Sequence, residues 1–174
     1  QFSNEHEGPQ GSSISDSVFR LQDKIYHLEC QSTPDSDMVV RMIEYDFAIA
    51  LDDARREGAA HRVRFPLSAV IYLRHTSSTP DALSLEVVFP DGQSVTYSVP
   101  VVKVQAYSLD ELFEKRLWLF LPFYIMRYES QFAAMEEDAS KRAPMLSELR
   151  EMSERLEEQL HGENLDGLYA DLME

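Results

Sequence analysis

The stretch KIYHLECQSTPDSD, residues 24–37, decides the fold, because it passes from a strand-like pattern through a turn to a helix start. Side chains alternate along a strand. One face therefore holds the odd-numbered positions: Ile25, His27, Glu29 and Gln31. The other face, which we expect to be the core side, holds Tyr26, Leu28 and Cys30. The pattern thus predicts a carboxylate and an amide side by side at the end of a strand.

A second strand, ISDSVFRL (14–21), precedes this one, and the two are joined at Gln22 and Asp23. If the hairpin folds symmetrically about that turn, facing residue numbers sum to 45, and Asp16 lies opposite Glu29 at a Cβ separation of about 5 Å. A three-residue turn would shift this register by one. Like charges at facing positions destabilise a sheet, and Mg²⁺ would relieve the repulsion, since it favours carboxylate and water ligands.

The rest of the chain predicts an α/β fold with a helical C-terminal part. A helix is expected over 36–58, a buried strand within 62–75, a hairpin over 83–89 and 93–99 around Pro90-Asp91-Gly92, and a strand over 101–107. SLDE (108–111) has the pattern of a capping box for a helix that Pro122 should kink. A last helix, expected to start near Pro144, carries an apolar stripe: Met145, Leu149, Met152, Leu156 and Leu160.

Composition limits the function classes. The chain has 174 residues, a net charge of −15 and one cysteine, Cys30, which excludes an internal disulfide and favours a reducing cytoplasm. We expect Cys30 to fill the core. No apolar run is long enough to span a membrane. Non-specific nucleic-acid binding depends on neutralising phosphates, so contact with DNA would have to be localised on one face.

The sequence also resembles a known family. Asp16 on one strand, followed by Glu29-Cys30-Gln31 on the next and then by a helix, is the pattern of the PD-(D/E)XK nucleases. The wider stretches HLECQSTPDSDMVVRMIEYDFAIAL (27–51) and VVKVQAYSLDELFEKRLWLFLPFYIMRYE (101–129) are similar to the PD-(D/E)XK nuclease family transposases, relatives of the recombination-promoting nucleases and mostly uncharacterised bacterial proteins. The resemblance implies a restriction-endonuclease-like mixed sheet flanked by helices.

The resemblance also implies a function, metal-dependent hydrolysis of DNA phosphodiester bonds. Asp16, Glu29 and the backbone carbonyl of Cys30 would hold Mg²⁺ or Mn²⁺. Gln31, where many relatives have Lys, would orient the attacking water. Arg41 and Tyr45, four residues apart on the following helix, would contact a phosphate or brace the site. The expected division is a flexible segment over 1–13, a nuclease-like domain over 14–135 and an acidic helical extension over 136–174.

Several residues of the sequence allow more than one interpretation. His27 is read as a surface or hydrogen-bonded histidine, and Asp46 either faces the site or is exposed. The family usually adds an acid from a helix before the first strand, and residues 1–13 do not look helical. That departure, with Gln31 in place of Lys, favours a second reading as an inactive relative that binds or assembles. A third reading is a homo-oligomer formed through the stripe of the last helix.

Overall fold

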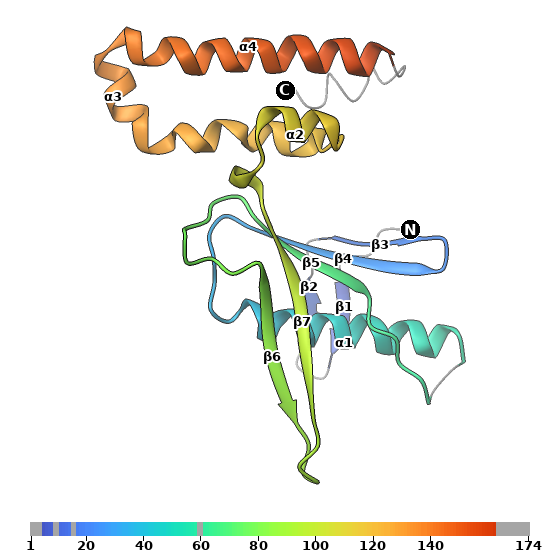
Figure 1. The fold of residues 1–174 in the computed structure, drawn as a ribbon. Helices are drawn as coiled ribbons and strands as arrows, with labels where there is room; N and C mark the ends of the chain where they lie inside the picture. Colours follow the sequence, from blue (N-terminus) through green and yellow to red (C-terminus); the bar gives the residue numbers. More distant parts are fainter. Residues whose placement is uncertain (1–4, 9–10, 15–16, 59–60, 163–174) are drawn as a thin grey trace. The chain divides into compact units, whose positions relative to one another are not determined.

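A computed structural model describes residues 5–8, 11–14, 17–58 and 61–162 of the chain (Figure 1). The chain divides into two compact units, residues 1–103 and 104–174. Unit 1 holds the strands and one long helix, and unit 2 is helical. The boundary falls earlier than the expected one at 136, because the residues after Lys103 pack with the last helix in a core of their own.

Unit 1 is built on a mixed sheet of five strands in the order β3-β4-β5-β7-β6. The strands are β3 (Ser17–Leu21), β4 (Lys24–Gln31), β5 (Leu67–Tyr72), β6 (Ala82–Val88) and β7 (Ser94–Lys103). The β3–β4 and β6–β7 pairs are antiparallel hairpins, whereas β4 runs parallel to β5 and β5 runs parallel to β7. The expected α/β class with a mixed sheet is confirmed.

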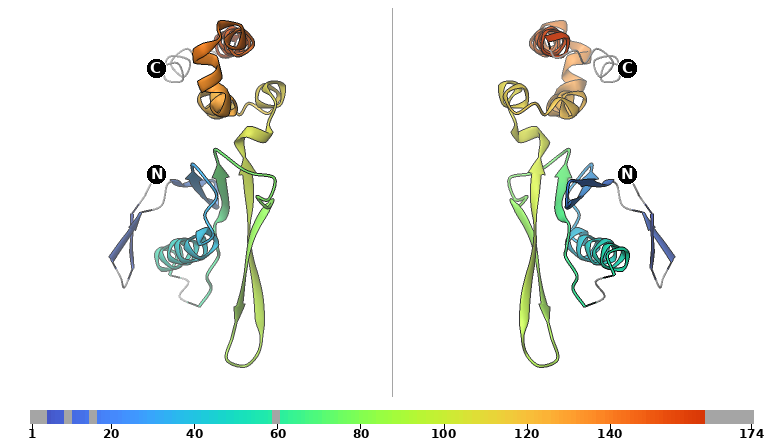
Figure 2. Two further views of the ribbon diagram at one scale, coloured as in Figure 1. Left: turned by 90° about the vertical axis from the view of Figure 1, so that its left-hand side faces the viewer. Right: turned by 90° about the vertical axis from the view of Figure 1, so that its right-hand side faces the viewer.

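The connection between the parallel strands β4 and β5 contains the helix α1 (Met38–Arg56), close to its predicted bounds. Gly58 follows it with φ of 68°, a conformation that suits a residue without a Cβ. The helix lies along one face of the sheet (Figure 2). A buried cluster joins it to β5 and β7 through Met38, Met42, Val70, Tyr72 and Val99.

The β3–β4 hairpin has the predicted register. Ser17 pairs with Leu28 and Leu21 pairs with Lys24, so that facing numbers sum to 45. Gln22 has φ of 55°, which is typical of a tight two-residue turn. The prediction of the core face was wrong. His27 and Glu29 are the buried side chains of β4, with 0% and 4% of their surface exposed, because this face lies against α1.

The N-terminal segment was expected to be irregular. It instead contains two short antiparallel strands, β1 (Glu5–Gly8) and β2 (Gly11–Ile14). At the other end of the unit, the Pro90-Asp91-Gly92 hairpin forms as predicted, with Gly92 at φ of 85°. The strand expected over 101–107 is the end of β7, followed by a 3₁₀ turn, η1 (Val104–Ala106).

Unit 2 consists of α2 (Leu109–Glu114), a run of 3₁₀ turns η2 (Trp118–Gln131), α3 (Phe132–Glu137) and α4 (Ala139–Gly162). The Ser108–Glu111 capping box is present in full. The expected helical break at Pro122 occurs earlier, at Arg116, which has φ of 55°. Pro144 was expected at the start of the last helix, yet it lies inside α4.

The apolar stripe of α4 packs within unit 2. Met152, Leu156 and Leu160 are buried in one cluster with residues of α2 and η2, including Leu112, Trp118 and Leu121. The most buried part of the stripe, which the third reading assigned to a homo-oligomer, is therefore covered by residues of the same unit. Among the residues that the structure describes, no helix is long and apolar enough to cross a membrane.

Candidate functional site

A buried polar cluster lies between α1 and the sheet, and Asp46 is at its centre. Asp46 is 1% exposed and is presented by the sheet-facing side of α1. His27 Nδ1 on β4 lies 2.6 Å from Asp46 Oδ1. The Tyr97 hydroxyl on β7 donates to Asp46 Oδ2 at 2.6 Å, and Ser68 Oγ on β5 lies 2.7 Å from each carboxylate oxygen. One carboxylate thus connects the helix to three strands.

His27 links this cluster to Glu29. Its Nε2 lies 3.2 Å from Glu29 Oε1, so that the imidazole bridges two carboxylates, one from α1 and one from β4. Burial lowers the pKa of His27, but the hydrogen bonds and charges of Asp46 and Glu29 outweigh that effect and raise it to about 9. His27 therefore carries a positive charge at neutral pH, with both ring nitrogens as donors.

Tyr97 stays a neutral donor in this environment. Burial and the Asp46 carboxylate raise the pKa of its hydroxyl well above the ordinary value near 10, because both disfavour a phenolate. The hydroxyl of Ser68 likewise has a proton to donate. The charges of the cluster are therefore one imidazolium and two carboxylates, an arrangement that is stable in a buried site only because hydrogen bonds satisfy them.

Glu29 and Gln31 lie near the carboxyl end of β4, as the sequence indicated. Glu29 faces Val70 of β5 and Gln31 faces Tyr72, in the parallel pairing. Glu29 is buried and Gln31 is half-buried on the same side of the strand. Asp16 lies outside the described residues. Its opposition to Glu29 remains a prediction that rests on the observed register of the neighbouring pairs.

Arg41 and Tyr45 are half-buried on α1, on the turns that precede Asp46. The Tyr45 ring meets the His27 ring edge-on at a centroid distance of 6.1 Å, so that it braces the bridging imidazole. The Arg41 guanidinium lies 3.4 Å from the Asp35 carboxylate and 2.9 Å from the sulfur of Met38, while its Nε is buried without a hydrogen-bond partner. The structure brings Tyr45 to the cluster, whereas Arg41 lies near the start of the helix.

The donor types near the end of β4 suit a hard divalent cation. The Glu29 carboxylate, the Gln31 amide and the Cys30 carbonyl all offer oxygen, which Mg²⁺ prefers. Within the described part of the chain, however, no group of three or more His, Cys, Asp or Glu side chains is arranged to hold a metal ion. Asp46 is fully engaged by His27, Ser68 and Tyr97. A metal centre near Glu29 would therefore need at least one ligand from outside the described side chains.

Cys30 was expected in the core and that prediction was wrong. Its side chain is exposed on the opposite side of β4 from Glu29. The error has the same cause as the inverted core face, because burial of the histidine and glutamate positions turns the cysteine outward. The backbone carbonyl, which was the proposed ligand atom, is unaffected by this correction.

Sequence reasoning missed Ser68 and Tyr97 and left Asp46 undecided. Asp46 interrupts the buried face of α1, between Met42 and Ile49. An acid at such a position is a signal, because a buried carboxylate requires partners. Ser68 and Tyr97 have no comparable signal, since a serine or tyrosine in a strand is ordinary.

Comparison with known proteins does not identify a family for this chain. No protein-family model, no curated protein and no solved structure gives a significant match to the chain.

Proposed function

We propose that the chain is a metal-dependent DNA endonuclease of the PD-(D/E)XK type, related to transposases, which hydrolyses phosphodiester bonds. The observation that supports this most directly is the β3–β4 register. The assignment depends on two acids facing each other across that hairpin. In every described pair of facing residues the two residue numbers sum to 45, which is the register that this arrangement needs. Continuing this register by one pair would set Asp16 opposite Glu29.

The proposed roles follow from the chemistry of each group. Asp16, Glu29 and the Cys30 carbonyl would hold Mg²⁺ or Mn²⁺, and the ion would supply Lewis acidity toward the phosphodiester and a water molecule. Gln31 would orient the attacking water through its amide. His27, fixed by Asp46, orients the Glu29 carboxylate; outer groups of this kind commonly position metal ligands. Arg41 contributes a positive charge near a phosphate group.

The test uses the full chain and supercoiled plasmid DNA. We expect nicking that requires Mg²⁺ or Mn²⁺ and that Glu29→Gln abolishes, with Asp16→Asn giving the same loss. The matched control is Glu154→Gln, which makes the same charge change at an exposed position of α4. Equal rates for wild type and Glu29→Gln, with folding verified by circular dichroism, would reject the nuclease.

A second candidate is an inactive relative that serves as a binding or assembly module. The observation that favours it is the His27–Glu29 contact, since an imidazolium at 3.2 Å already compensates the charge that a metal would otherwise neutralise. Thermal unfolding separates the two candidates. A competent site raises the melting temperature as Mn²⁺ is added, since a ligand that binds the folded state stabilises it. The inactive relative shows no such shift, and adding Mn²⁺ changes its melting temperature no more than that of Glu29→Gln.

A further inference from the structure

The segment between α1 and β5 has a charge opposite to that of the whole protein. ARREGAAHRVRFP, residues 54–66, contains four arginines and one acid, whereas the whole chain has a net charge of −15. The four are exposed in the structure: Arg55, Arg56, Arg62 and Arg64. Arg20 on β3 adds a fifth, paired with Asp53 of α1. A concentration of exposed arginines creates a local positive potential that net charge conceals.

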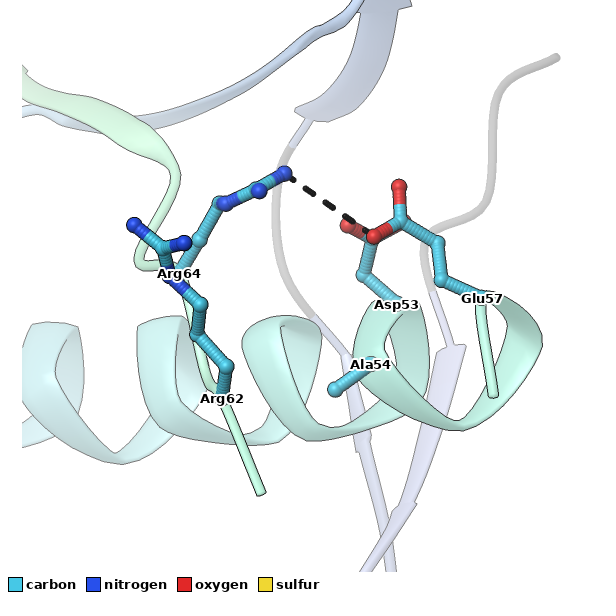
Figure 3. Close-up of a pocket in the computed structure, with 5 residues that line it drawn as sticks. All are labelled: Asp53, Ala54, Glu57, Arg62 and Arg64. Atoms are coloured by element: carbon cyan, nitrogen blue, oxygen red, sulfur yellow. Dashed lines mark ion pairs between the residues drawn. The ribbon is translucent and has the colours of Figure 1, made fainter. Parts of the chain in front are cut away.

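The arginines are only partly neutralised by their neighbours. Arg56 lies 2.7 Å from Asp52, while the Arg64–Glu57 contact is loose at 3.9 Å. For Arg55 and Arg62 the described residues provide no ion pair. Figure 3 shows a pocket at this place, lined by Arg62 and Arg64 on one side and by Asp53, Ala54 and Glu57 of the helix end on the other. Exposed ion pairs of this kind are weak, so these guanidinium groups are available to an external anion.

Exposed aromatic rings adjoin the arginines. Phe65 follows Arg64 directly and is 44% exposed, and Phe47 on α1 is 48% exposed. Their ring centroids are 6.1 Å apart, and Phe65 also contacts Tyr97 at 5.9 Å, which holds its ring in place. Val63, between the two arginines, is 37% exposed. Large apolar side chains gathered on a surface indicate an interaction site rather than ordinary packing.

We propose that the exposed side chains on either side of the α1–β5 connection form a docking surface for single-stranded nucleic acid: Arg55, Arg56, Arg62, Arg64, Phe65 and Phe47. Guanidinium groups bind phosphates and aromatic side chains stack on unpaired bases, and this combination distinguishes strand-binding surfaces. An acidic peptide would use the arginines, but only a nucleic-acid strand carries a flat ring beside every charged group to match Phe65 and Phe47. This inference rests on the proposed function for its choice of DNA as the strand.

The experiment measures binding without cleavage. A fluorescein-labelled single-stranded DNA oligonucleotide is titrated with the full chain in EDTA, by fluorescence anisotropy, at several NaCl concentrations. We expect Arg62→Ala/Arg64→Ala to weaken binding by roughly tenfold and to reduce the slope of log K against log salt by about 1.4, near 0.7 for each lost phosphate contact. Phe65→Ala should weaken binding by roughly tenfold while leaving the slope unchanged, because stacking involves no counterion release.

The matched control is Lys141→Ala/Arg142→Ala, which removes the same charge from exposed positions of α4. Equal weakening by the two double variants would overturn the proposal, since binding would then follow net charge alone. An unchanged salt slope in Arg62→Ala/Arg64→Ala would overturn it as well. A third result would also overturn the proposal. In it, wild type binds phosphatidylserine vesicles, Arg62→Ala/Arg64→Ala does not, and both proteins bind the oligonucleotide equally well. Unchanged circular dichroism melting of each variant verifies folding.

The two proposals fail separately. If Glu29→Gln binds the oligonucleotide as wild type does but wild type never cuts DNA, the docking surface stands and the nuclease falls. If wild type cuts DNA and Arg62→Ala/Arg64→Ala binds and cuts normally, the nuclease stands and the surface falls.

Discussion

The cores of the two units are built in different ways. In unit 1 the interface between α1 and the sheet contains apolar contacts and also the cluster of His27, Glu29 and Asp46, all nearly inaccessible. In unit 2 the described core cluster is composed of Leu, Met and aromatic side chains. Apolar residues of similar volume would often stabilise a fold as well as a buried ion pair does. A charged cluster in a core is therefore a candidate for a functional constraint on the sequence.

The largest expected effect tests whether the polar cluster supports unit 1. Asp46→Asn removes the charge that balances His27 and disrupts the acceptor shared by Ser68 and Tyr97. We expect a loss of about 3–5 kcal/mol in the free energy of unfolding, because breaking a buried pair leaves an uncompensated charge. Urea unfolding followed by far-ultraviolet circular dichroism measures it. Asp52→Asn, on the same helix but paired at the surface with Arg56, should cost less than about 1 kcal/mol.

The single tryptophan sharpens this comparison. Trp118 is buried in unit 2, so its fluorescence reports the unfolding of that unit. The helices of both units contribute to the circular dichroism signal. Asp46→Asn should therefore shift only the part of the circular dichroism transition that does not coincide with the fluorescence transition, and leave the fluorescence transition in place. A common shift of both transitions would mean that the two units unfold cooperatively. The two cores would then not have separate free energies of unfolding that could be compared.

The next effect tests the apolar core of unit 2. Leu156 is 1% exposed, and Leu156→Ala should cost about 3 kcal/mol through lost burial and the cavity that remains. This time the fluorescence transition should shift to lower urea. Leu146→Ala on the same helix is the control, since Leu146 is 45% exposed and its removal should have little effect. Equal effects of the two variants would contradict the packing of α4 described here.

Local sequence signals predicted the elements well where the signal and the structure share the same few residues. The β3–β4 register followed from a two-residue turn at Gln22 and Asp23, and the helix start at Ser108 followed from its capping box. The break near Arg116 had no such signal, since it depends on one residue adopting a left-handed conformation. The sequence predicts the break at Pro122 instead, although proline is also compatible with 3₁₀ turns.

The candidate site was only half predictable, because the burial of its residues depends on partners distant in the sequence. Glu29 and Gln31 could be singled out from their strand and the following turn. The buried face of β4 could not be predicted. The apolar residues Tyr26 and Leu28 favour burial of the opposite face, whereas His27 is buried because it pairs with Asp46, nineteen residues later in the sequence. Polar residues at interior positions are where pattern-based reasoning fails, and such failures coincide with functional sites.

The smallest expected effect is the pH dependence of unit 1. Asp46, Glu29, Tyr97 and Ser68 are the polar groups of the cluster, and the first two raise the pKa of His27 to about 9 from about 6.5 in the unfolded chain. A raised pKa stabilises the folded state fully below pH 6.5 and progressively less as pH rises through 9. Between pH 6 and 8.5 we expect a loss of about 2 kcal/mol in the circular dichroism transition, measured in EDTA.

The same variant that removes the partner of His27 provides the control for this effect. Without the Asp46 charge, burial opposes protonation and Glu29 alone favours it, so the pKa of His27 should fall toward or below its ordinary value. Asp46→Asn should therefore lose less stability than wild type between pH 6 and 8.5, in addition to being less stable throughout. If both proteins lose stability equally over this range, the pH dependence arises from other groups and the bridging imidazolium is not what distinguishes the core of unit 1. If the difference is found, the charge on His27 is a property of the fold itself.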